Sequence, residues 1–332
     1  MKIDAIWEEL ENDKSFHSGL LYKRYSAKIK PNIFISLKAP EKFRCISFLI
    51  DSSFEFDKNQ LKYLRDIKIE SAFDPLHPGK KFILVLLLNK QYNDIFTTLC
   101  QDLIDGLSEI DNEDILIEKL IERLIKWQSL FEKAGESGLS ESSQRGLFGE
   151  MYFLRKCLSK SLHYIDWIKA WKGPEKSIQD FQYSDWAVEV KTTHGKNHQK
   201  IHISSERQLD DSIIPNIFLY HLSFDIRPSH GETLNSVIED IFSLLSTSSA
   251  DTNLLRLKLI ESGYFEIHKE FYENTGYTIR GENIYNVQGS FPRITEKQVP
   301  VGVGDVKYSI VLSHTEEWNM DESELFKRLC VR

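Results

Sequence analysis

The chain has 332 residues, of which 41% are hydrophobic and 28% are charged, and its formal net charge is −8 at pH 7. This length predicts more than one domain, and the apolar fraction excludes a mainly disordered chain. The acidic balance argues against a protein whose whole surface coats nucleic acid, although it is compatible with a local basic groove.

The sequence also indicates where the protein resides. It contains no run of about 18 apolar residues, so we expect no membrane-spanning helix. The first residues lack the basic start and apolar middle of a signal peptide. The wide spacing of the cysteines favours free, buried thiols over a zinc site. These features predict a cytoplasmic protein without a membrane partner. The cysteines are Cys45, Cys100, Cys157 and Cys330.

Residues 1–135 are predicted to form an N-terminal α+β domain that is rich in strands and ends in long helices. Short apolar runs indicate the strands, and apolar side chains at helical spacing indicate the helices. Gly135 is expected to end the second helix. The predicted strands cover 32–39, 43–50 and 81–89, and the predicted helices cover 92–109 and 113–135.

A further helix is predicted to begin at Ser140 and to run through the sequence GLFGEMYFL. Gly146 and Gly149 each cost a helix about 1 kcal/mol relative to alanine, so we expect the helix backbone to lie close to a sheet at both positions. Glu150 lies at the edge of the apolar stripe, where a carboxylate either faces solvent or needs a buried partner. The stripe itself consists of Leu147, Met151, Leu154 and Leu158.

The sequence SIQDFQYSDWAVEVKTTHG, at 177–195, predicts a β-hairpin. A two-residue loop at Ser184–Asp185 would join two strands of alternating side chains. Counting outward from this loop places Asp180 opposite Glu189, with Lys191 two residues further along the same face. The other face would be apolar and consists of Phe181, Tyr183, Trp186, Val188 and Val190.

The two opposed carboxylates of this hairpin would destabilise a sheet by repulsion. Lys191 offsets part of that repulsion, and a divalent cation would offset more. Mg²⁺ is held by one or two carboxylates, while water and substrate phosphate complete its shell. The hairpin therefore predicts a metal site that is open on one side. The alternative is an ordinary strand surface, on which the same side chains simply face solvent.

A basic loop follows the second strand. It carries Lys196, Lys200 and three histidines, which suits contact with a phosphate backbone. A histidine metal site is disfavoured, because Gly195 and its neighbours indicate a loop where the spacing would need a helix. Ser205 and Gln208 then have the spacing of a capping box, which predicts a helix whose first amides point at an anion. Gln208 is either a cap or a substrate contact.

The remaining elements complete a central region at 136–248 and a C-terminal α+β region at 249–332. Trp167 and Trp171 are expected to pack in the core or at its edge. The predicted strands lie at 217–226, 284–291 and 307–314, and the predicted helices lie at 232–246, 252–263 and 322–330.

The order of these motifs resembles the PD-(D/E)xK nuclease superfamily. A helical Glu bracketed by glycines comes first, Asp and Glu-x-Lys follow on adjacent strands, and a serine-rich segment with Gln comes last. Residues 140–225 are similar to a bacterial family of PD-(D/E)xK-motif proteins found near restriction-modification and phage-defence genes. Gln179 stands where the motif has a proline, a position that varies. Asp185 is a rival for the first acid, but the predicted register puts it in the turn.

The resemblance implies an α/β (α+β) protein with a restriction-endonuclease-like core, in which helices flank a central mixed β-sheet. It also implies Mg²⁺-dependent hydrolysis of phosphodiester bonds, with Mn²⁺ able to substitute. Asp180, Glu189 and the backbone carbonyl of Val190 would hold the metal. Lys191 would position the attacking water and stabilise charge on the phosphoryl oxygens. Glu150 would bind a second metal or orient a water.

The favoured hypothesis is an endonuclease that acts on double-stranded DNA in a bacterial restriction or anti-phage system. A methyltransferase or an ATPase would be its partner proteins, and a homodimer is one of its expected states. The alternative is a catalytically silent subunit that binds DNA or assembles a complex; the intact set of two acids and one lysine argues against it. RNA ranks lower as a substrate because no aromatic-rich RNA motif is present. The expected DNA contacts are Lys196, Lys200, Ser205 and Gln208.

Overall fold

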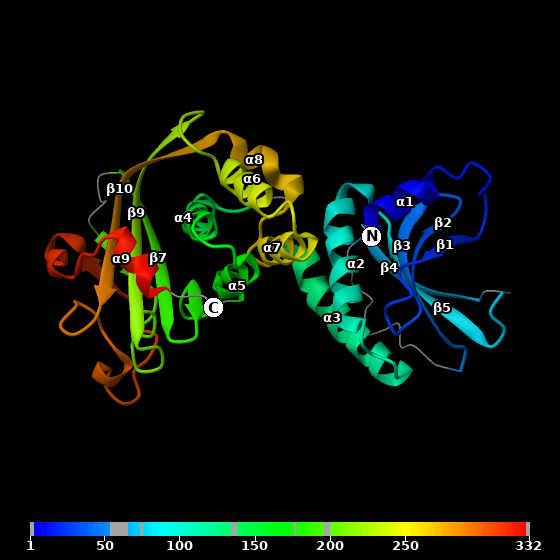
Figure 1. The fold of residues 1–332 in the computed structure, drawn as a ribbon, viewed down its shortest axis with the longest axis horizontal. Helices are drawn as coiled ribbons and strands as arrows, with labels where there is room; N and C mark the ends of the chain where they lie inside the picture. The colour runs from blue at the N-terminus through cyan, green and yellow to red at the C-terminus, as the bar shows by residue number, and fades with distance from the viewer. Residues whose placement is uncertain are drawn as a thin grey trace. The chain divides into compact units, whose positions relative to one another are not determined.

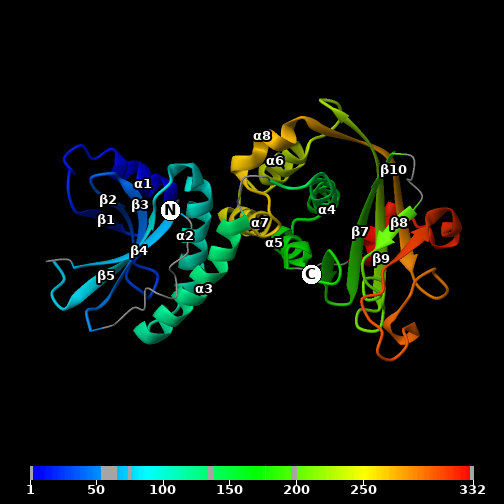
Figure 2. The same ribbon diagram turned by 180° about the vertical axis from the view of Figure 1, so that it is seen from behind.

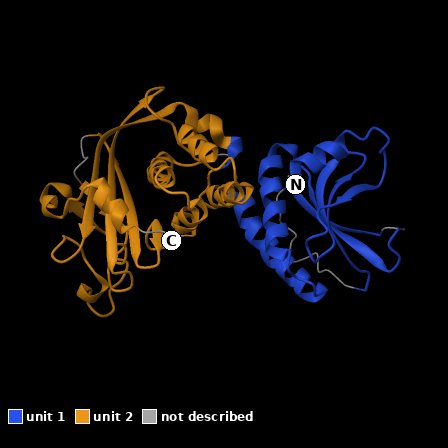
Figure 3. Cartoon of the chain, in the orientation of Figure 1, with its two compact units in different colours: residues 1–136, 265–267 blue, residues 137–264, 268–332 orange. Residues whose placement is uncertain are grey.

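The computed structural model describes most of the chain as two compact units. The described residues are 3–53, 66–73, 76–133, 138–175, 177–195 and 200–329. The N-terminal unit comprises 1–136 with 265–267, and the C-terminal unit comprises 137–264 with 268–332 (Figure 3). Among the described helices, none is both long and apolar enough to pass through a bilayer.

The N-terminal unit is a five-stranded antiparallel sheet with helices on one side (Figure 1). Its strands follow the order β1-β2-β3-β5-β4. The Trp7 indole of the first helix stacks on Phe96 of the second with 5.6 Å between ring centroids, so both helices share one apolar core. The elements are α1 (Ile3–Glu11), β1 (Leu20–Arg24), β2 (Ile33–Lys38), β3 (Phe43–Asp51), β4 (Ile67–Phe73), β5 (Lys80–Leu87), α2 (Asn93–Leu107) and α3 (Glu113–Lys133). The five elements predicted in this region are confirmed, and Gly135 lies outside the described residues.

The C-terminal unit is built on a mixed four-stranded sheet with the order β10-β9-β7-β6. β6 and β7 form an antiparallel hairpin, β7 and β9 are parallel, and β9 and β10 are antiparallel. The predicted mixed sheet is therefore confirmed. Its strands are β6 (Phe181–Tyr183), β7 (Trp186–His194), β9 (Asn216–Pro228) and β10 (Thr275–Val287).

Helices cover one face of this sheet, as Figure 2 shows from behind. Alternate residues of the central strands, such as Val188 on β7 and Phe218 and Tyr220 on β9, are buried in a core shared with these helices. The helices are α4 (Glu141–Ser159), α5 (Tyr164–Ala170), α6 (Leu234–Leu244), α7 (Ser249–Glu261), α8 (Lys269–Glu273) and α9 (Glu322–Arg328). The predicted stripe of α4 lies in this core, so the sequence pattern identified its buried side correctly.

The opposite face is covered along part of its length by a two-stranded ribbon, β8 (Lys200–Ile203) and β11 (Tyr308–Val311). Ile201 and Ile310 of the ribbon pack with Ile217 and Leu219 of β9 in a second, smaller core. Because β10 is the edge strand of the mixed sheet, part of the predicted C-terminal region belongs to the same sheet as the hairpin. Short 3₁₀ helices lie at Lys90–Tyr92, Gly173–Glu175, Glu266–His268, Glu296–Gln298, Leu312–His314 and Glu316–Trp318.

Three of the four cysteines lie within the described residues. Cys45, Cys100 and Cys157 are buried and free, as their spacing predicted. Burial raises the pKa of the Cys45 thiol to about 12, which keeps it protonated. Cys330 lies outside the described residues.

Candidate active site

The β6–β7 hairpin has the predicted register. Phe181 pairs with Val188 and Tyr183 pairs with Trp186, so the loop consists of Ser184 and Asp185. Ser184 has a φ of 46°, the left-handed conformation that a tight two-residue loop requires. The apolar face of the hairpin is buried against the helices. The charged residues of β7 therefore lie on the other face, as expected.

Asp180 lies one residue before β6, where the hairpin ladder ends. Its Oδ2 accepts a hydrogen bond of 2.8 Å from the backbone N–H of Val190. Since the N–H and C=O of one strand residue point to the same edge, the Val190 carbonyl also faces the Asp180 side of β7. Burial raises the pKa of the Asp180 carboxyl. The rival acid, Asp185, is exposed in the turn.

Glu189 is buried in the middle of β7, with only 1% of its surface exposed. Its Oε1 lies 2.7 Å from Nζ of Lys191. Its Oε2 is buried and has no hydrogen-bond partner within the described part of the chain. Burial, together with the neighbouring Asp180 carboxylate, raises the pKa of Glu189 to about 8. Burial alone would lower the pKa of Lys191, but the Glu189 carboxylate reverses this and raises it.

Glu150 reaches the same group of charges from α4. Its Oε2 accepts a hydrogen bond of 2.7 Å from Nε1 of Trp171. Burial, followed by the Asp180 charge, raises the pKa of Glu150 well above its ordinary range. Gly173 makes room for this carboxylate, because a Cβ there would lie 2.4 Å from Oε2. The structure thus brings Glu150, Asp180, Glu189 and Lys191 within electrostatic reach of one another.

The two glycines of α4 differ in their surroundings. A Cβ on Gly149 would lie 2.5 Å from Cγ2 of Thr192 on β7, so this glycine lets the helix approach the sheet as predicted. Nothing lies within 4 Å of the corresponding position on Gly146. The prediction for Gly146 was wrong, because a Cβ at that residue would meet open space.

The predicted helix at Ser205 is absent, and residues 206–209 form turns instead. Ser205 Oγ accepts from the N–H of Arg207, so it does not cap a helix through residue 208. Gln208 Oε1 instead accepts from the N–H of Ser204 at 2.9 Å and from Nζ of Lys191 at 3.2 Å. The Glu206 carboxylate is engaged by the N–H of Val306. These long-range contacts hold the segment as turns, and they could not be inferred from the capping pattern.

The structure describes two of the other three predicted DNA contacts, and no contact between either of them and the carboxylates is seen. Lys200 is exposed at the start of β8, and Ser205 is partly exposed on the turn. Lys196 lies outside the described residues. Of the histidines near this loop, His194 is exposed and His202 shares a hydrogen bond of 2.9 Å with Ser309. The assignment of these residues to DNA binding stays a prediction.

Sequence reasoning missed three residues that support the acidic group. Trp171 was expected only to pack, yet its indole N–H also binds Glu150. Gly173 gives that carboxylate its space. Gln179, which replaces the motif proline, is buried and donates to the backbone carbonyls of Arg207 and Gln208 at 3.3 and 3.2 Å. For Trp171 and Gly173, the available sequence signal was the segment WKGP, in which a glycine follows two residues after a tryptophan.

The donor set fits a hard divalent cation. Carboxylate oxygens and a backbone carbonyl are the ligands that Mg²⁺ takes, usually with only one or two carboxylates. No three His, Cys, Asp or Glu side chains within the described ranges form a complete metal-binding cluster. Nevertheless, Glu189 Oε2 is buried without a hydrogen-bond partner among described atoms, and burial together with the Asp180 carboxylate raises the pKa of both Glu150 and Glu189. A positive ion beside these oxygens would give Glu189 Oε2 a partner and would lower the pKa of the acids.

A family model described as "Putative PD-(D/E)XK family member, (DUF4420)" matches residues 3–313. The match extends through both compact units and includes the whole hairpin. No curated protein and no solved structure matches the chain.

Proposed function

Since this chain belongs to the DUF4420 family of PD-(D/E)XK proteins, a nuclease-like family, we propose that it is a Mg²⁺-dependent DNA endonuclease. The observation that carries this proposal is the state of Glu189. One of its oxygens is ion-paired with Lys191, and the other is buried without a hydrogen-bond partner among the described residues. Asp180 lies close enough to raise its pKa. A buried acid in this situation is typical of a catalytic position.

Asp180, Glu189 and the Val190 carbonyl would hold Mg²⁺ at the edge of β7 that β6 leaves uncovered. When bound, Mg²⁺ supplies Lewis-acid chemistry, which neutralises phosphate charge and acidifies water. The hydrogen bond from the Val190 N–H fixes the orientation of the Asp180 carboxylate. Both acids must be deprotonated to bind the ion, so binding is expected to release protons.

Lys191 is the only member of the group with a positive charge, and it would act on the substrate phosphate. Its Nζ bridges Glu189 Oε1 and Gln208 Oε1, so the ammonium is held in place from two sides. A held ammonium can stabilise charge that develops on the phosphoryl oxygens. Glu150, oriented by the Trp171 indole, would accept a proton or orient a water at the far side of the group.

A cleavage assay on supercoiled plasmid DNA tests the proposal. We expect nicked and linear products with Mg²⁺ or Mn²⁺ and none with EDTA. Asp180→Asn, Glu189→Gln and Lys191→Ala should each lower the rate by about 10³-fold, the loss typical of removing one electrostatic contributor. Asp185→Asn is the matched control, because Asp185 is exposed in the adjacent turn, and it should keep full activity. Full activity in the Glu189→Gln, Lys191→Ala double variant would reject the site.

A silent DNA-binding or scaffolding subunit is the second candidate. One observation favours it, namely that the Lys191 ammonium lies 2.7 Å from Glu189 Oε1 and balances part of the acidic charge without a metal. Such a subunit would retard duplex DNA in a gel without cutting it under any metal condition. A role in a restriction or anti-phage system, with a methyltransferase or an ATPase as partner, belongs to the same proposal. It is supported by the resemblance of residues 140–225 alone.

A further inference from the structure

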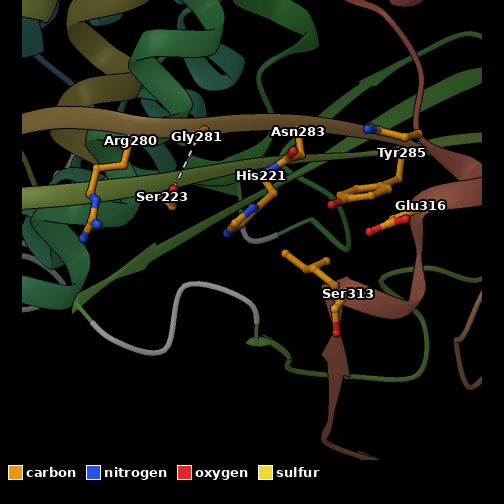
Figure 4. A pocket seen from close by; sticks show the side chains of 10 residues that line it. His221, Ser223, Arg280, Gly281, Asn283, Tyr285, Ser313 and Glu316 are labelled. Carbon is orange, nitrogen blue, oxygen red and sulfur yellow. Dashed lines mark hydrogen bonds between the residues drawn. The ribbon is translucent and has the colours of Figure 1, made fainter.

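A cavity of about 550 Å³ lies on the sheet face opposite the helices, within the C-terminal unit. Its size is within the range of small-molecule sites. Figure 4 shows Arg280 at one end of the cavity, His221 in the middle, and Tyr285 with Glu316 at the other end. The residues on which the inference depends are His221, Ser223, Arg280, Asn283, Tyr285 and Leu312.

The sheet changes character along this face, from apolar to polar. On β9, Leu219 is buried under the ribbon, and the next two residues on that face are His221 and Ser223. On β10, Tyr285 pairs with Leu219 and Asn283 pairs with His221. The side chains of both strands therefore change from apolar or aromatic to polar at neighbouring positions of the register. His221, Ser223 and Asn283 form a polar floor of the cavity, which begins where the β8–β11 ribbon no longer covers the sheet. This arrangement indicates a surface suited to a polar ligand.

The floor is buried although it is polar. His221 is 1% exposed and Ser223 is 6% exposed. Buried polar groups cost free energy unless they are hydrogen-bonded, and His221 Nε2 shares a bond of 2.8 Å with Oγ1 of Thr193 on β7. This bond fixes the imidazole ring in the floor.

A β-bulge shapes the open end of the cavity. The β10 register shifts between Ile279 and Gly281, and Arg280 is the extra residue. Bulges redirect side chains and occur often beside active sites. The Arg280 side chain is exposed and makes no ion pair or hydrogen bond with any described residue. A Cβ on Gly281 would lie 3.0 Å from Ser223 Oγ, so glycine keeps the wall clear.

The cavity adjoins the acidic group on the same face of the sheet. Lys191 on β7 pairs with His221 on β9, and Thr193 pairs with Ser223. Neighbouring strands are about 4.8 Å apart, so the floor begins one strand away from Lys191. A phosphate held at Lys191 would place the rest of its own nucleotide within reach of the cavity.

We propose that this cavity binds the base of the nucleotide next to the cleaved phosphodiester, turned out of the DNA stack. The proposal rests on the proposed nuclease function. Enzymes that bind an extruded base hold it with hydrogen bonds to its edge and with aromatic or apolar walls. The Asn283 amide can both donate to and accept from a base edge, and Tyr285 and Leu312 supply the apolar walls. Arg280 at the open end suits the phosphate on the other side of the same nucleotide.

Free nucleotides provide the first test, because their binding does not depend on cleavage. Calorimetry of the full chain in EDTA should detect the deoxynucleoside 5′-monophosphates, with inorganic phosphate at least about tenfold weaker. Asn283→Leu should weaken nucleotide binding by about tenfold, as loss of a good amide–base pair does. Asn286→Leu is the matched control, because Asn286 is on the same strand but faces the opposite side. Equal binding of phosphate and nucleotides, or no effect of Asn283→Leu, would overturn the proposal.

A duplex with 2-aminopurine at successive positions distinguishes an extruded base from a free nucleotide. In EDTA, where the DNA stays whole, wild-type protein should increase the emission at one position, and Asn283→Leu should abolish the increase while Asn286→Leu should not. Nucleotide binding without any emission increase would show that the cavity takes free nucleotides only, against the proposal. Cleavage with neither signal would reject the cavity but not the nuclease. Both signals without cleavage would reject the nuclease but not the cavity.

Discussion

At the residue scale, the environment of Glu189 has a measurable consequence for stability. The folded chain keeps the Glu189 proton up to about pH 8, whereas an unperturbed glutamate loses it near 4.5. Between these two values the folded state binds more protons than the unfolded state. The free energy of unfolding therefore falls as the pH rises from about 4.5 to about 8. The raised pKa values of Asp180 and Glu150 act in the same direction.

Glu189→Gln should make the metal-free protein more stable at pH 8 and should flatten its pH profile. Glutamine mimics the neutral acid that the folded state favours and does not titrate, and its amide oxygen can still accept a hydrogen bond from Lys191. We expect a rise in Tm of about 2 °C at pH 8, equivalent to one or two kcal/mol in a chain of this size, and little change at pH 5. Thermal unfolding in EDTA across this pH range measures the effect. A Tm difference that is the same at both pH values would contradict the assigned environment.

Gln208 is a positioning residue whose contribution can be separated from folding. Its Oε1 holds Nζ of Lys191 at 3.2 Å, so Gln208→Ala should lower kcat by about tenfold, the value of one hydrogen bond to a charged group, and leave KM nearly unchanged. Gln182→Ala is the matched control, because Gln182 donates to Gln179 at 2.6 Å and not to Lys191. Steady-state kinetics of both variants provide the comparison. Equal losses of kcat, or a rise in KM with constant kcat, would show that Gln208 does not act through Lys191.

At the scale of elements, the contact of α4 with β7 depends on one glycine and not on its neighbour. Gly149→Ala should destabilise the protein by about 1–3 kcal/mol, because the added methyl overlaps Thr192. Gly146→Ala meets no atom and should be neutral or stabilising by up to about 1 kcal/mol through helix propensity. Urea unfolding measures both. Thr192→Ser removes Cγ2, so it should restore much of the stability of Gly149→Ala; no restoration would mean that the helix contact is not the cause.

Elements with strong local signals could be predicted, and those that depend on distant partners could not. The β6–β7 register follows from alternation and a two-residue loop, and the stripe of α4 follows from helical spacing. The turn at Ser205 is held by contacts from Lys191 and Val306, which a local capping pattern does not contain. The same limit applied to the cavity. His221 and Asn283 become neighbours only when β9 and β10 pair, and each is an ordinary polar residue in its own strand.

At the scale of the whole molecule, the predicted chemistry is concentrated in one of the two units. Glu150, Asp180, Glu189 and Lys191 all belong to the C-terminal unit, and so do the turn that carries Gln208 and the cavity. The N-terminal unit has its own sheet and apolar cores but none of the predicted ligands. The family match extends over both units. A ligand that binds the site should therefore affect the backbone of the two units unequally.

Mg²⁺ should slow amide hydrogen exchange in the C-terminal unit selectively. A ligand stabilises the states that bind it by about 2.7 kcal/mol at 100 times its Kd. The free energy of a local opening that breaks the site rises by the same amount, so the amides released by that opening exchange more slowly. The protection should be greatest in β6, β7 and the part of α4 around Glu150, and β1 to β5 should exchange at unchanged rates.

Glu189→Gln is the matched control and should lose the effect, while Asp185→Asn should retain it. Mass spectrometry of peptides with and without Mg²⁺ makes the measurement, and it does not depend on catalytic activity. Equal protection of both units, or protection that survives Glu189→Gln, would place the ion elsewhere and would remove the basis for the proposed nuclease site.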